Sequence, residues 1–217
     1  MTLRIECADG RERVRAVTAA IAALRRGDLV ILPTENTYVL ATDAFSPRGV
    51  RALRQAKGHA EETPLGLLVP RAGTVPGIAA DVSSTARTLM AAFWPGMVTL
   101  LLDAQPTLAW DHPQGSPVAV RAPAHPVALG VVTEAGPTAA SGITDAGDPV
   151  RSCELAMQIH PDAAIALDAG VLEARWSDSE DPELASTIID VRGDSAVIMR
   201  HGAVSEERIR AALAATS

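Results

Sequence analysis

The sequence has few cysteines, few aromatic residues and no long hydrophobic run. Only Cys7 and Cys153 occur among 217 residues, without a CxxC motif or a Cys/His cluster, so we expect neither a disulfide scaffold nor a metal site. Apolar stretches such as LVIL and VTLLL are far shorter than the roughly 20 residues of a membrane helix. The first residues, MTLRIECADGRER, are charged and unlike a secretion signal. These absences indicate a soluble cytoplasmic protein with no membrane partner.

Positive charge and stacking groups are also scarce. The formal net charge is −7, which argues against a uniformly basic surface for duplex nucleic acid but is compatible with a local basic cleft. Aromatic residues make up 3% of the chain, so stacking platforms for single strands are largely missing. No Walker loop, GxGxxG, HExxH or GxSxG motif occurs. The usual NTPase, dinucleotide, zinc-protease and hydrolase sites therefore lack their parts.

Helical and strand patterns alternate along the whole chain without a low-complexity linker. Val14, Val17, Ile21 and Leu24 recur at spacings of three and four, which predicts a helix that ends at 27–28, before the buried strand LVILPT. Other predicted strands are 65–69, 98–104, 117–123, 138–141, 164–170 and a closing hairpin-type pair at 186–191 and 195–200. The other predicted helices begin at Ser46-Pro47 and end near Gly58, run through Leu89 and Met90, cover 126–134 and 149–160, and begin at Ser205. This order indicates one α/β domain over residues 1–217.

Polar residues gather where the predicted strands meet loops, which is where α/β proteins bind ligands. Thr34 and Tyr38 follow the first buried strand and could bind a polar substrate, or form an ordinary solvated turn. Lys57 and His59 could hold phosphate, or complement the end of a helix dipole. Arg121 interrupts an apolar strand, so it must contact either a ligand or an internal anion.

Two further polar groups occupy glycine-containing segments near the ends of later strands. Ser141 lies in TAASGITDAG, and Ser186 and Arg200 belong to the closing pair of strands. Hydroxyl groups beside glycines suit phosphate oxygens, and the alternative is two ordinary turns. The acidic stretch at 177–183 is either a solvated loop or a lid over the site.

Seven blocks, taken in order, resemble the threonylcarbamoyl-adenylate synthase family, the YrdC-like proteins of tRNA modification. FWPG before a hydroxyl-containing strand, RxPxHP, and STIxD before an R-x-G ending are the most specific. The resemblance extends from about Arg13 to Leu213 and implies a twisted, mixed or mostly parallel open sheet with flanking helices around a concave basic cleft. It also implies that the C-terminal domain of longer relatives is missing. The blocks are PTENTY, AKGHAEETPLGLLV, FWPGMVTLLL, VRAPAHP, ASGITDAG, STIIDV and MRHG.

The resemblance implies a nucleotidyltransferase that joins L-threonine, bicarbonate and ATP, with Mg²⁺, into threonylcarbamoyl-adenylate and releases pyrophosphate. Partner proteins then transfer the threonylcarbamoyl group to adenosine 37 of tRNA, so RNA is an expected partner. Lys57 and Arg121 are implied as catalytic residues. The implied substrate-binding residues are Thr34, Tyr38, His59 and Ser186, and the implied nucleotide-binding residues are Lys57, Arg121, Ser141, Thr144 and Arg200.

Several positions depart from the family pattern. The K-x-R pair reads Lys57-Gly58-His59, and histidine cannot bind a carboxylate with two parallel hydrogen bonds as arginine does. Gly142 and Thr144 stand where the S-x-N element has its serine and asparagine, and Val39 replaces a glycine. Two alternatives therefore accompany the synthase hypothesis. One is a diverged paralogue that uses another amine, and the other is a non-catalytic nucleotide- or RNA-binding homologue.

Overall fold

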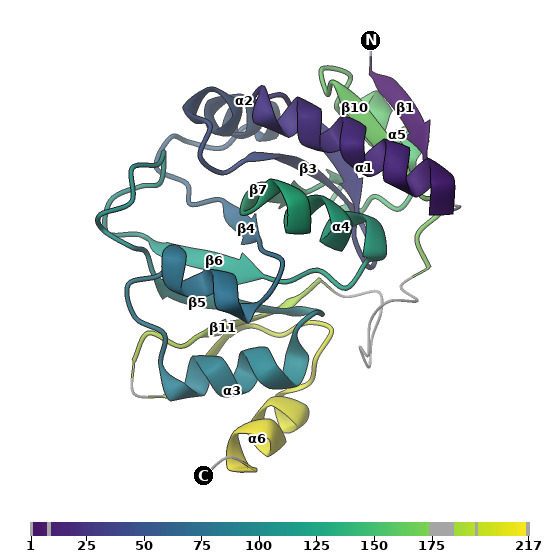
Figure 1. Cartoon of the computed structure of the whole chain (residues 1–217). Helices are drawn as coiled ribbons and strands as arrows, with labels where there is room; N and C mark the ends of the chain where they lie inside the picture. Colours follow the sequence, from purple (N-terminus) through teal and green to yellow (C-terminus); the bar gives the residue numbers. More distant parts are fainter. Residues whose placement is uncertain (1, 8–9, 174–184, 194, 216–217) are drawn as a thin grey trace.

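Ten strands form one mixed sheet in the computed structural model, in the order β1-β10-β2-β3-β7-β4-β6-β5-β11-β12 (Figure 1). The structure describes residues 2–7, 10–173, 185–193 and 195–215. β1 is parallel to β10, β10 to β2, β4 to β6 and β5 to β11, whereas the other neighbours are antiparallel. The predicted mixed α/β sheet with flanking helices is thereby confirmed.

The elements have the following bounds. The strands of the large sheet are β1 (Leu3–Glu6), β2 (Val30–Pro33), β3 (Tyr38–Asp43), β4 (Gly66–Leu68), β5 (Val98–Asp103), β6 (Pro117–Arg121), β7 (Thr138–Gly142), β10 (Ile165–Asp168), β11 (Thr187–Asp190) and β12 (Val197–Arg200); β8 (Thr144–Asp145) and β9 (Asp148–Pro149) pair separately. The helices are α1 (Gly10–Arg25), α2 (Pro47–Lys57), the 3-10 helix η1 (Ala72–Gly77), α3 (Ser84–Phe93), α4 (Pro126–Ala135), α5 (Cys153–Ile159) and α6 (Glu206–Ala214).

Local signals place most helix ends where the sequence predicts them. The Ser46 hydroxyl accepts a hydrogen bond from the Gly49 N–H at the start of α2, and Gly58 ends that helix with a φ of 62°. The Ser205 hydroxyl accepts from the Arg208 N–H and begins α6. The closing hairpin is also confirmed, because β11 and β12 pair in antiparallel orientation.

One predicted helix begins later than expected, and four strands, β1, β3, β8 and β9, were not predicted. The helix predicted over 149–160 begins only at Cys153, because Ser152 caps it and Pro149 pairs in β9 with Thr144 of β8. The chain after Thr37 continues as β3 rather than as a solvated turn, since its side chains are buried on both sides. β1 was not predicted, because its buried and exposed side chains do not alternate clearly. Its place in the sheet depends on pairing with β10, which is distant in the sequence.

The helices cover the sheet unequally. α1 and α4 pack side by side on one face, against β1, β10, β2 and β3 (Figure 1). Helices α2, α3, α5 and α6 contribute side chains to the larger core on the other face. The half of the sheet made by β6, β5 and β11 therefore has one face that α1 and α4 do not cover.

Candidate functional site

The face of β5, β6 and β11 that α1 and α4 leave uncovered carries three of the nine site residues predicted from the sequence. In β5, buried Val98, Leu100 and Leu102 alternate with the less buried Thr99 and Leu101, as expected when one face of a strand is open. The polar groups on or beside this open face are Thr99, Arg121, Ser186 and Arg200, from four different segments. Such a convergence of cations and hydroxyls is suited to an anionic ligand.

Arg121 is paired inside the protein. Its Nη1 atom donates to both carboxylate oxygens of Glu35 at 2.7 Å, and the Ala124 N–H donates to Oε1 of Glu35 at the same distance. Glu35 is fully buried and Arg121 is 9% exposed. Of the two alternatives left open by the sequence, an internal anion is therefore present. The Nε and Nη2 atoms of Arg121 have no hydrogen-bond partner among the described residues, so a ligand could still reach this guanidinium.

Ser186, Thr99 and Arg200 form a second group beside Arg121. The hydroxyls of Ser186 and Thr99 lie 2.8 Å apart. Arg200 donates to the Ser186 carbonyl through Nη2 at 2.7 Å and through Nε at 3.1 Å, and to the Ser186 hydroxyl at 3.2 Å. Burial lowers the pKa of Arg200, and the nearby charge of Arg121 lowers it further. Arg121 and Arg200 thus contribute two positive charges that influence each other on this side of the sheet.

Lys57 belongs to a separate group at the end of β7. It is the single lysine of the chain, its pKa is lowered by burial, and its Nζ atom donates to the Gly142 carbonyl at 2.8 Å. Ser141 precedes that carbonyl within β7, and Thr144 follows it, exposed, in β8. The structure thus brings Lys57, Ser141 and Thr144 into one region. His59 is half-buried just beyond α2.

Thr34 and Tyr38 are fully buried, and their hydroxyls already have partners. The Thr34 hydroxyl donates to the Thr37 carbonyl at 2.7 Å. The Tyr38 hydroxyl donates to the Gly170 carbonyl at 2.8 Å and accepts from the Ala169 N–H at 3.0 Å. In this structure the two hydroxyls hold the chain around β2 and β3 in place, and their assignment to a substrate pocket stays a prediction. Val39 is buried in the core beneath α1 and α4.

Sequence reasoning missed two members of the site. Glu35 is not among the residues predicted from the sequence, although a buried arginine requires an anion and Glu35 lies in the PTENTY block next to the first strand. Thr99 is visible only as the hydroxyl in the strand after FWPG. The candidate lid at 177–183, by contrast, lies outside the described residues.

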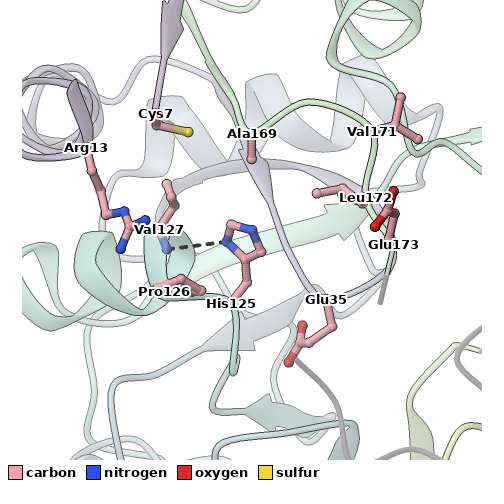
Figure 2. Close-up of a pocket in the computed structure, with 10 residues that line it drawn as sticks. All are labelled: Cys7, Arg13, Glu35, His125, Pro126, Val127, Ala169, Val171, Leu172 and Glu173. Atoms are coloured by element: carbon pink, nitrogen blue, oxygen red, sulfur yellow. Dashed lines mark hydrogen bonds between the residues drawn. The ribbon is translucent and has the colours of Figure 1, made fainter. Parts of the chain in front are cut away.

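A cavity of about 240 Å³ adjoins this site on the other side of Glu35 (Figure 2). It opens at the carboxyl ends of the parallel strands β1 and β10 and at the N-terminus of α4. Arg13 and His125 contribute the basic groups, and the His125 ring lies between Arg13 and Glu173 in this view. The lining residues are Cys7, Arg13, Glu35, His125, Pro126, Val127, Ala169, Val171, Leu172 and Glu173.

His125 caps the N-terminus of α4. Its Nδ1 atom accepts a hydrogen bond from the Val127 N–H at 3.3 Å, and the residue is 4% exposed. Burial lowers the pKa of His125 to about 4; Arg13 adds to that shift and Glu35 opposes it. A proton on Nδ1 would also remove the capping bond, so the folded state requires the neutral ring.

We therefore predict that stability falls as the pH drops from about 6.5 to about 4. In that range the unfolded state takes up a proton at His125 that the folded state does not, which costs up to about 3 kcal/mol. Urea unfolding at pH 7 and pH 5 measures this loss. His125→Asn keeps a capping side chain and should lose less stability than the parent between the two pH values. An equal loss in both proteins would assign the effect to other histidines, such as His112 and His160, whose pKa values burial also lowers.

The described residues contain no helix long and apolar enough to cross a membrane. Within the same part of the chain, no three His, Cys, Asp or Glu side chains are grouped as metal ligands would be.

Comparison with known proteins gives consistent matches over nearly the whole chain. The family model Sua5_yciO_yrdC, described as "Telomere recombination", matches residues 22–202. A Mycobacterium tuberculosis protein named "Putative threonylcarbamoyl-AMP synthase" is 36% identical over 212 residues, which cover 96% of this chain and 94% of that protein. The Bacillus subtilis threonylcarbamoyl-AMP synthase is 28% identical over 202 residues, covering 91% of this chain and 56% of its own length.

Solved structures also match this chain over nearly its whole length. Pyrococcus abyssi Sua5 in complex with L-threonine superposes with a TM-score of 0.83 at 24% identity, covering 98% of this chain and 61% of the Sua5 chain. Escherichia coli YciO superposes with a TM-score of 0.79 at 17% identity, covering 96% of this chain and 98% of its own. At these identities the two structures establish the fold. The chain spans somewhat less than two thirds of the Sua5 protein.

Proposed function

Because the chain belongs to the Sua5/YciO/YrdC family, we propose that it is a threonylcarbamoyl-AMP synthase that acts on L-threonine, bicarbonate and ATP. The observation that carries the proposal is the pair of guanidiniums, Arg121 and Arg200, on one open face of the sheet beside the hydroxyls of Ser186 and Thr99. Two neighbouring cations of this kind suit a triphosphate. The named synthases among the relatives and the threonine complex of Sua5 support the choice of substrates.

The reaction requires positioning more than a protein nucleophile. Threonine and bicarbonate condense to N-carboxy-threonine with loss of water, a carboxylate oxygen of that group attacks the α-phosphorus of ATP, and pyrophosphate leaves. Negative charge grows on the phosphate oxygens during the transfer, so fixed cations lower the barrier. In this proposal the free nitrogens of Arg121 and the Arg200 guanidinium hold the triphosphate, and Lys57 holds the amino-acid end.

Mg²⁺ enters this proposal only as the counter-ion of ATP. No described group of three acidic, His or Cys side chains resembles a resident metal site, so the ion would arrive with its nucleotide. When bound, it neutralises phosphate charge. The proposed product is used by a separate assembly that transfers the threonylcarbamoyl group to adenosine in tRNA, so contacts with RNA and with those proteins are part of the same proposal.

Pyrophosphate release from the purified protein tests the proposal. With ATP, Mg²⁺ and bicarbonate, we expect release that depends on L-threonine, and mass spectrometry should detect the carbamoyl-adenylate. Release that requires a different amine would favour the diverged paralogue, a specific alternative because His59, Gly142 and Thr144 all alter the region around Lys57. Nucleotide binding without pyrophosphate would favour a non-catalytic homologue.

Lys57 offers a direct prediction because it is the only lysine. An amine-acetylating reagent can modify only Lys57 and the N-terminal amine, and burial lowers the pKa of Lys57, so its neutral form should react readily. We expect L-threonine with ATP and bicarbonate to protect Lys57 from acetylation while the N-terminal amine reacts at its usual rate, as followed by peptide mass spectrometry. Lys57→Ala should lower pyrophosphate release by about tenfold or more. Unchanged labelling together with full activity of Lys57→Ala would exclude this residue from the site.

A further inference from the structure

The cavity beside α4 contains a cation whose hydrogen-bonding capacity is not used. The Nε atom of Arg13 is buried and has no hydrogen-bond partner, and among the described residues the guanidinium makes no ion pair (Figure 2). A guanidinium carries five N–H donors, and a buried donor without a hydrogen bond destabilises the protein. In Figure 2 the Arg13 side chain points toward His125 and the first turn of α4. The structure therefore presents an unsatisfied cation at the wall of a cavity.

The backbone around this cavity also favours a negatively charged ligand. β1, β10 and β2 are mutually parallel neighbours, and the cavity lies at their carboxyl ends, where open α/β sheets commonly bind ligands. The ten-residue helix α4 begins there with Pro126, so the positive end of its dipole faces the cavity. His125 stays neutral near pH 7, since burial lowers its pKa to about 4, and it adds no second charge.

The rest of the lining restricts what kind of anion fits. Glu35, which is paired with Arg121, and Glu173 also line the cavity, so the lining carries negative as well as positive groups and suits a single negative charge better than a dianion such as phosphate. The volume of about 240 Å³ far exceeds that of an inorganic ion, because a water molecule takes up about 30 Å³. The remaining lining is apolar: Cys7, whose thiol is kept neutral by burial, together with Val127, Ala169 and Leu172. A single negative charge on a small apolar body matches these properties.

We propose that this cavity binds a small organic monocarboxylate, with its carboxylate at Arg13 and the N-terminus of α4 and its apolar body against Val127, Ala169 and Leu172. Cys7 and Arg13 precede the residues 22–202 that the family model matches, so the site uses a part of the chain outside that match. It is distinct from the open face that carries Ser186 and Arg200. The proposal does not depend on the proposed reaction.

Calorimetric titration of the full chain with n-butyrate tests it, with butyramide and inorganic phosphate as comparison probes. We expect saturable binding of butyrate, and no comparable binding of the uncharged amide or of phosphate. Arg13→Gln should weaken butyrate binding about ten- to a hundredfold, the effect of losing one charge-assisted contact. Arg15→Gln is the matched control, since it removes the same charge from an exposed position two residues further along α1 and should leave the affinity unchanged.

A second variant separates binding in the cavity from a general effect of charge. Ala169→Leu should shift the preferred chain length from butyrate toward acetate, because the added side chain fills part of the apolar wall. Equal affinity for butyrate and butyramide, preferential binding of phosphate, equal weakening by Arg13→Gln and Arg15→Gln, or no saturable binding at millimolar concentrations would each overturn the proposal. Thermal unfolding of every variant shows whether it remains folded.

Discussion

Arg121→Ala is expected to lose pyrophosphate formation by about a hundred- to a thousandfold and to destabilise the fold. The loss of activity follows if the guanidinium stabilises charge that develops on the phosphates. The loss of stability has a separate cause, because among the described residues the fully buried Glu35 carboxylate keeps only the Ala124 N–H as a donor. Breaking a buried ion pair by removing one partner costs about 3–5 kcal/mol. Urea unfolding and the pyrophosphate assay measure the two effects independently.

The double variant Glu35→Gln/Arg121→Ala separates the two roles. Neutralising Glu35 removes the unpaired buried charge, so stability should largely recover while activity should not. Arg210→Ala is the control, because Arg210 pairs with Glu206 on the exposed surface of α6 and should change stability by less than about 1 kcal/mol. Recovery of activity in the double variant would show that Arg121 has only a structural role.

Gly202→Ala is expected to destabilise the protein by about 2 kcal/mol or more and to lower activity with it. A Cβ atom at Gly202 would lie 2.3 Å from the Ala185 carbonyl oxygen and 2.7 Å from backbone atoms of Ser186 and Thr187. Backbone atoms cannot rotate away as a flexible side chain does, so the backbone at Ser186, directly before β11, must shift. That shift would disturb the hydrogen bonds from Arg200 to Ser186. This close approach accounts for a glycine two residues after Arg200.

Gly77→Ala is the matched control for Gly202→Ala. Gly77 lies in η1 with nothing within 4 Å of its would-be Cβ atom, and the substitution should change stability by less than about 1 kcal/mol. Unfolding in urea and pyrophosphate release should be measured on both variants. If Gly202→Ala were as stable and as active as Gly77→Ala, the packing of Gly202 against Ser186 would not constrain the site.

Elements with strong local signals were predictable from the sequence. Ser46 and Ser205 cap helices through their own hydroxyls, and Gly58 ends α2 with a positive φ, so each boundary depends on a few neighbouring residues. The prediction of a helix from Pro149 was wrong because the pairing of β9 with β8 outweighed the local preference. β1 escaped prediction for a similar reason: its place in the sheet depends on β10, far away in the sequence.

The candidate site also combines features that local sequence determines with features that depend on distant segments. The residue types and the order of blocks such as FWPG, VRAPAHP and STIIDV were enough to predict the family and the α/β sheet, because buried apolar runs and capping residues act over short distances. Tertiary structure alone decided that Arg121 pairs with Glu35, 86 residues away, and that Lys57 reaches Gly142, 85 residues away. It also placed Arg13 at the wall of the cavity beside α4. A sequence pattern specifies which groups need partners, whereas the partners themselves depend on how distant segments of the sheet are brought together.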